Sequence, residues 1–159
     1  MGGLIAMLAG GATACGGGPP PSPQLPPLPQ FVPAGATYGP GANGENVDCD
    51  RLLTAEDLAA AVGQPIQSLG WNLNSCFWAT PTRRIQLVLQ TGADSHKWFA
   101  GLREPGASAG MTPVGGYDFE ALEKSGSFGG FAPGRAALLH SPLSSAAAAP
   151  LVRQVLARL

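Results

Sequence analysis

Residues 83–91 read RRIQLVLQT, and this stretch decides the fold class. Apolar side chains recur at positions 85, 87 and 89, and polar side chains stand at positions 84, 86 and 90. Alternation with a period of two is typical of a β-strand with one buried and one wetted face. Such strands pair in antiparallel sheets, whereas the strands of parallel sheets are apolar on both faces. We therefore expect an antiparallel sheet that contains this stretch.

A capped helix precedes this strand, in DCDRLLTAEDLAAAVG at residues 48–63. Thr54 is a favourable N-cap, and Asp57 stands where a capping-box side chain reaches back to the cap. Gly63 is suited to the left-handed conformation that ends many helices. The sequence therefore predicts a helix over residues 55–62.

The rest of the chain alternates between the two kinds of pattern. A short helix is expected from Asp94 or Ser95 to Leu102, and SFGGFAPGRAALLHS reads as a hairpin with its turn at Pro133 and Gly134. The remaining expected elements are strands at 65–69 and 73–80, and a C-terminal helix with Pro150 in its first turn. Residues 114–122 fit a strand or a helix, and the alternation of Tyr117 and Phe119 favours the strand. This order predicts an α+β domain in which helices pack on one face of an antiparallel sheet.

The chain divides into three parts by composition. Residues 1–14 contain an apolar run as long as the core of a signal peptide, too short to span a bilayer. No Lys or Arg precedes that run, so we expect the true start to lie upstream. Residues 15–46 are rich in Gly and Pro and predict a disordered tether, whereas residues 47–159 predict the folded domain.

Cys15 stands at the boundary between the apolar run and the tether. The preceding Ala-Thr-Ala resembles the small residues of bacterial lipoprotein signals, in which the cysteine is lipidated. We expect a lipid anchor on Cys15 that holds the protein at the extracytoplasmic face of the cell membrane. The alternative is a signal peptide that is cut elsewhere, with Cys15 incidental.

Cysteine number supports the same interpretation, because the chain has three cysteines and lipidation of Cys15 leaves an even pair. Cys49 and Cys76 are expected to form a disulfide, which stabilises a domain of this kind by roughly 3.5 kcal/mol in the loop-entropy model. Two cysteines without a nearby histidine or a CxxC spacing make half of a metal site at most. The sequence therefore predicts neither a metal nor a cofactor.

The folded part resembles a family of small exported lipoprotein domains of mycobacteria and related bacteria. In that family a cysteine precedes an LLT-type helix and pairs with a later Cys-x-Trp, and the resemblance spans roughly residues 48–159. It implies an envelope lipoprotein and carries over no catalytic residue. The matching positions are Cys49, Leu52, Leu53, Thr54, Cys76 and Trp78.

Few residues in the sequence are candidates for catalysis or for binding nucleic acid. The net charge of −1 and the scattered Lys and Arg residues exclude a basic surface for nucleic acid. His140 is followed by Ser141, but adjacent strand residues point to opposite faces and cannot easily share a proton. An envelope hydrolase that uses Ser141 or another serine with His140 is the alternative to a non-catalytic protein.

The aromatic residues suggest a binding role. Most of them are expected in the core, but Trp71, Trp98 and Phe131 stand at the edges of predicted elements. These three are candidates to line a groove between helix and sheet that takes an apolar small molecule such as an acyl chain. The sequence thus favours a non-catalytic binding or accessory module of the cell envelope. A structural lipoprotein that binds an envelope protein is a further alternative.

Overall fold

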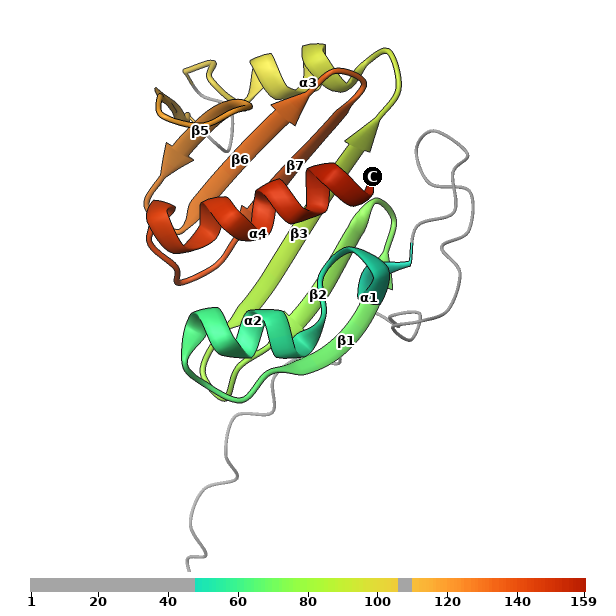
Figure 1. Ribbon diagram of the computed structural model, residues 1–159, viewed down its shortest axis with the longest axis vertical. Helices are drawn as coiled ribbons and strands as arrows, with labels where there is room; N and C mark the ends of the chain where they lie inside the picture. The colour runs from blue at the N-terminus through green and yellow to red at the C-terminus, as the bar shows by residue number, and fades with distance from the viewer. Residues whose placement is uncertain (1–47, 106–109) are drawn as a thin grey trace, which may run out of the picture.

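The computed structural model describes residues 48–105 and 110–159 as an α+β domain around one antiparallel sheet (Figure 1). The strand order is β1-β2-β3-β7-β6-β5-β4, and every neighbouring pair is antiparallel. The predicted signal peptide and tether, including Cys15, lie outside the described residues. The strands are β1 (Gln67–Asn72), β2 (Ser75–Ala79), β3 (Arg84–Thr91), β4 (Thr112–Val114), β5 (Glu120–Lys124), β6 (Ser127–Ala132) and β7 (Arg135–His140).

Four helices pack on this sheet, and α2 follows its sequence signals closely. The hydroxyl of Thr54 accepts a hydrogen bond from the backbone N–H of Asp57, and the Asp57 carboxylate accepts one from the backbone N–H of Thr54. Gly63 ends the helix in the left-handed conformation, at φ 71°. The predicted α+β class and the capping box are therefore confirmed. The helices are α1 (Cys49–Leu52), α2 (Ala55–Val62), α3 (Ser95–Gly101) and α4 (Ser145–Arg158).

Two predicted elements differ in the structure. The single strand expected over residues 114–122 is two strands, β4 and β5, because the chain bends between them and Gly116 adopts a φ of 94°. Pro150 lies inside α4 and not in its first turn. The helix begins earlier because Ser144 caps it and the alanines that follow are strong helix formers.

The two faces of the sheet are covered unequally. We call the first face the side that packs against α1, α2 and α4, and the second face the opposite side, which packs against α3. The expected packing of helices on one face holds for three helices, whereas α3 lies on the second face. The first face carries Cys76, Trp78, Ile85, Leu87, Phe128 and Leu139, and the second face carries Phe77, Gln86, Val88, Ser127, Leu138 and His140.

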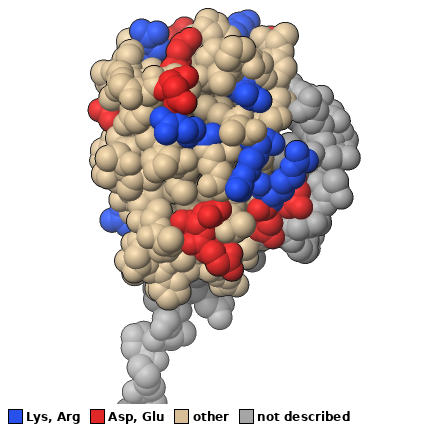
Figure 2. Space-filling model, viewed as in Figure 1, with Lys and Arg blue, Asp and Glu red and all other residues tan. Residues whose placement is uncertain are grey.

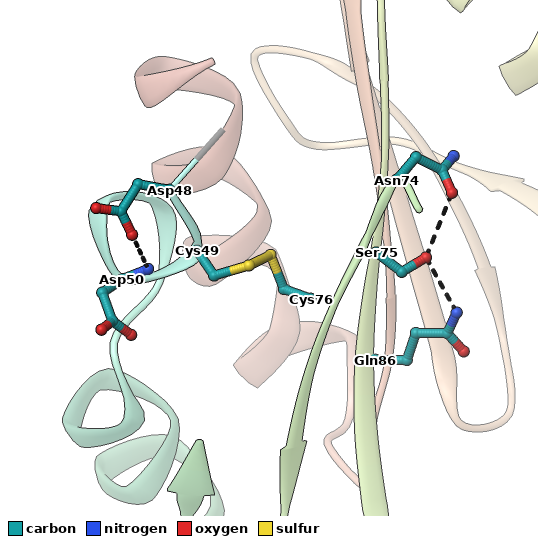
Figure 3. Close-up of a disulfide and its surroundings, with 7 residues drawn as sticks. All are labelled: Asp48, Cys49, Asp50, Asn74, Ser75, Cys76 and Gln86. Carbon is teal, nitrogen blue, oxygen red and sulfur yellow. Dashed lines mark hydrogen bonds between the residues drawn. A yellow bond between two sulfur atoms is a disulfide. The ribbon is translucent and has the colours of Figure 1, made fainter. Parts of the chain in front are cut away.

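A disulfide joins the N-terminal helices to the sheet. Cys49 of α1 is bonded to Cys76 of β2, with their Cα atoms 5.8 Å apart (Figure 3). Helix α4 adds a second connection, because the side-chain amide of Gln154 donates a hydrogen bond of 2.8 Å to the Asp57 carboxylate. The disulfide pairing predicted from the number of cysteines is thus present in the structure.

Candidate functional site

The part of the second face that α3 leaves uncovered carries a line of polar side chains. Strand register places Phe77 beside Gln86, Gln86 beside His140, and His140 beside Ser127. We call these four residues the cross-strand row. All four are half-buried, and none belongs to the apolar cluster that α3 forms with the sheet. The row therefore offers polar groups at a partly exposed surface.

Hydrogen bonds hold the polar members of the row in place. The Ser127 hydroxyl lies 2.8 Å from Nδ1 of His140. The side-chain amide of Gln86 donates to the Ser75 hydroxyl over 3.2 Å, and that hydroxyl donates to the Asn74 side chain over 3.5 Å (Figure 3). Figure 3 also shows that this chain of bonds lies on the side of β2 and β3 opposite the disulfide. Each side chain is thereby oriented before any ligand arrives.

The half-buried position of His140 favours its uncharged imidazole. Burial lowers the pKa of His140 from its ordinary value of 6.5, because the half-buried site disfavours the charged form. A neutral imidazole donates one hydrogen bond and accepts one. The row therefore presents hydroxyl, amide and neutral imidazole groups.

A cleft of about 570 Å³ lies beside α3 on the second face, and no residue of the row lines it. We call it the α3–β3 cleft, because one wall is α3 and Gln90 of β3 forms part of the other. Its apolar lining comes from Trp98 and Leu102, which pack, like Val88 of β3, against the buried cluster of the second face. The cleft is wide open to solvent, and Gln90, Asp94 and Lys97 add polar and charged groups to its apolar wall. It is lined by Gln90, Asp94, Lys97, Trp98, Gly101 and Leu102.

A second hollow, of about 650 Å³, lies between the start of α4 and the turn that joins β5 to β6. Most of its lining is small and polar, and Ser144 already uses its hydroxyl to cap α4. Leu143 is the large aliphatic residue in this lining. The hollow is therefore less suited to an apolar ligand than the α3–β3 cleft.

The structure separates the three aromatic residues predicted to bind a ligand. Trp98 lines the α3–β3 cleft. Phe131 lies on the same face but packs under α3 with Phe99, their ring centroids 5.7 Å apart. Trp71 of β1 pairs with Cys76 and packs against the core of the first face. These rings do not share one groove, and Trp98 is the one that lines the cleft.

His140 meets a serine that the sequence reasoning did not single out. The hydroxyl of Ser141 accepts from the backbone N–H of Leu143, whereas Ser127 contacts the imidazole. The sequence does indicate this contact, because a two-residue turn at Pro133 and Gly134 places Ser127 opposite His140 in the hairpin. Within residues 48–105 and 110–159, no hydrogen bond or ion pair joins His140 to a carboxylate.

The acidic residues near α1 and α2 serve the helix ends. Asp48 accepts a hydrogen bond from the backbone N–H of Asp50 at the start of α1, and Asp57 belongs to the capping box of α2. Partial burial raises the pKa of Asp50, with further contributions from the charges of Asp48 and Glu56. The described part of the chain contains no group of three or more His, Cys, Asp or Glu residues that could hold a metal ion.

Charges on the helix-covered face are mixed in sign. Figure 2 shows acidic and basic side chains lying beside one another on this face. Arg153 of α4 and Asp118 form an ion pair of 2.8 Å, but both side chains are more than half exposed. Exposed pairs of this kind contribute little to stability.

Comparisons of the chain with protein-family models, curated proteins and solved structures found no match. The described helices include none that is both long and apolar enough to cross a membrane. The family resemblance stated above therefore stays a prediction, and the geometry of the second face is the basis for a functional proposal.

Proposed function

We propose that this protein is a lipid-anchored, extracytoplasmic module of the cell envelope that binds a small apolar molecule and performs no catalysis. The observation that carries the proposal is the α3–β3 cleft, whose wall contains Trp98 and Leu102. Sequence supports the location, because Cys15 follows a signal-like apolar run and precedes a proline-rich tether.

Unequal coverage of the sheet supports a binding role. The first face is closed by three helices and stabilises the domain, whereas the second face keeps a half-buried surface and an open cleft. Ligand sites commonly combine a preformed apolar wall with a few oriented polar groups. Trp98 offers a large apolar surface to a ligand at a small cost in conformational entropy.

Mass spectrometry of what copurifies with the protein tests the binding function. We expect an apolar compound to be enriched with the wild type and lost with Trp98→Ala, because that change removes the aromatic wall of the cleft. Trp71→Ala is the matched control, since Trp71 packs on the first face. Equal recovery from both variants, or none from the wild type, would contradict the proposed binding site.

Intact-mass analysis of the membrane fraction tests the location. We expect an acylated species that begins at Cys15, and we expect Cys15→Ser to release the protein from the membrane. Unmodified wild-type protein in the medium would refute the lipid anchor. The result bears on location alone and leaves the cleft to be judged by the copurification experiment.

A second candidate function is hydrolysis, which one distance favours: the 2.8 Å between the Ser127 hydroxyl and Nδ1 of His140. In such a reaction the Ser127 oxygen would bond to the carbonyl carbon of an ester while His140 takes the hydroxyl proton; the alcohol would leave with that proton, and water would then release the acid and free Ser127. Labelling with a fluorophosphonate tests this function, because the Ser127 oxygen would displace fluoride from phosphorus. Labelling lost in Ser127→Ala but kept in Ser141→Ala would support a hydrolase, and an unlabelled wild type would exclude this use of Ser127.

A further inference from the structure

We draw no further inference here: the strongest candidate, the half-buried surface that Gln86, His140 and Ser127 form on the second face between Arg84 and Lys124, carries no proposal, because nothing in the described part of the chain shows what covers it.

Discussion

Phe77 and Trp78 are adjacent aromatic residues on β2 and show how differently the two faces of the sheet are used. Trp78 is 0% exposed under the helices of the first face, whereas Phe77 stays half-buried on the second. The same strands therefore supply a closed core on one side and a partly open surface on the other. The contrast indicates that stability comes mainly from the first face, which leaves the second free to bind a ligand.

The largest expected effect is a difference in the free energy of unfolding between variants of these two aromatic residues. Trp78→Ala should lower the free energy of unfolding by about 3–5 kcal/mol, because it empties a large site that fixed neighbours cannot refill. Phe77→Ala should lower it by less than about 2 kcal/mol, since the ring already meets solvent. Urea denaturation measures both values. Equal losses would show that the second face contributes as much to stability as the first.

Removal of the disulfide tests how far the first face depends on its covalent link. Replacing Cys49 and Cys76 by alanine should lower the free energy of unfolding by about 3 kcal/mol. The disulfide closes a loop in the unfolded chain, and without this loop the conformational entropy of the unfolded state is higher. Denaturation of the wild type with and without a reductant supplies the control. An unchanged midpoint in both experiments would mean that α1 and α4 hold this region without the bond.

Two adjacent glycines on β6 test whether the first face is packed more tightly than the second. A Cβ at Gly130, on the first face, would lie 2.6 Å from a methyl group of Val152 in α4, whereas a Cβ at Gly129 would lie 3.3 Å from the Phe99 ring. Gly130→Ala should therefore cost about 1–3 kcal/mol, because α4 must move away. Gly129→Ala should cost less than about 1 kcal/mol. Thermal unfolding of the two variants side by side measures the difference, and a reversed order would contradict the tighter packing of the first face.

The smallest expected effect concerns His140 on the second face. Its pKa is lowered in the folded state, so the unfolded state binds the proton more readily and the free energy of unfolding falls as pH drops below about 6.5. The decrease should end once the pH is below the folded pKa of His140. His140→Gln should lose this part of the pH dependence in urea denaturation series. A wild-type curve identical to that of the variant would exclude a contribution from His140.

Local signals predicted most of the individual elements. The capping box of Thr54 and Asp57 fixed the start of α2, and the turn at Pro133 and Gly134 was sufficient to predict the β6–β7 hairpin. Helix α1 was missed because four residues are too few to show a periodic pattern. The turn register also implied the contact between Ser127 and His140, which the sequence reasoning did not use.

The position of α3 could not be predicted from local patterns. Leu138 and Leu139 of β7 are both buried, so this strand is apolar on both faces and does not indicate which side a helix will cover. The groove expected to join Trp71, Trp98 and Phe131 required these rings to lie on one side of the sheet. In the structure β1 directs Trp71 to the first face, while Trp98 and Phe131 lie on the second.

By itself the sequence determined the α+β class, the antiparallel alternation of β3, the capped helix α2 and the pairing of Cys49 with Cys76. The pairing of β3 with β7, the position of α3 on the second face, and the row formed by Gln86, His140 and Ser127 follow only from the three-dimensional structure. The physical reason is the range of the interactions. Caps, turns and alternation act between residues a few positions apart, whereas strand order follows from the burial of apolar side chains that are distant in the chain.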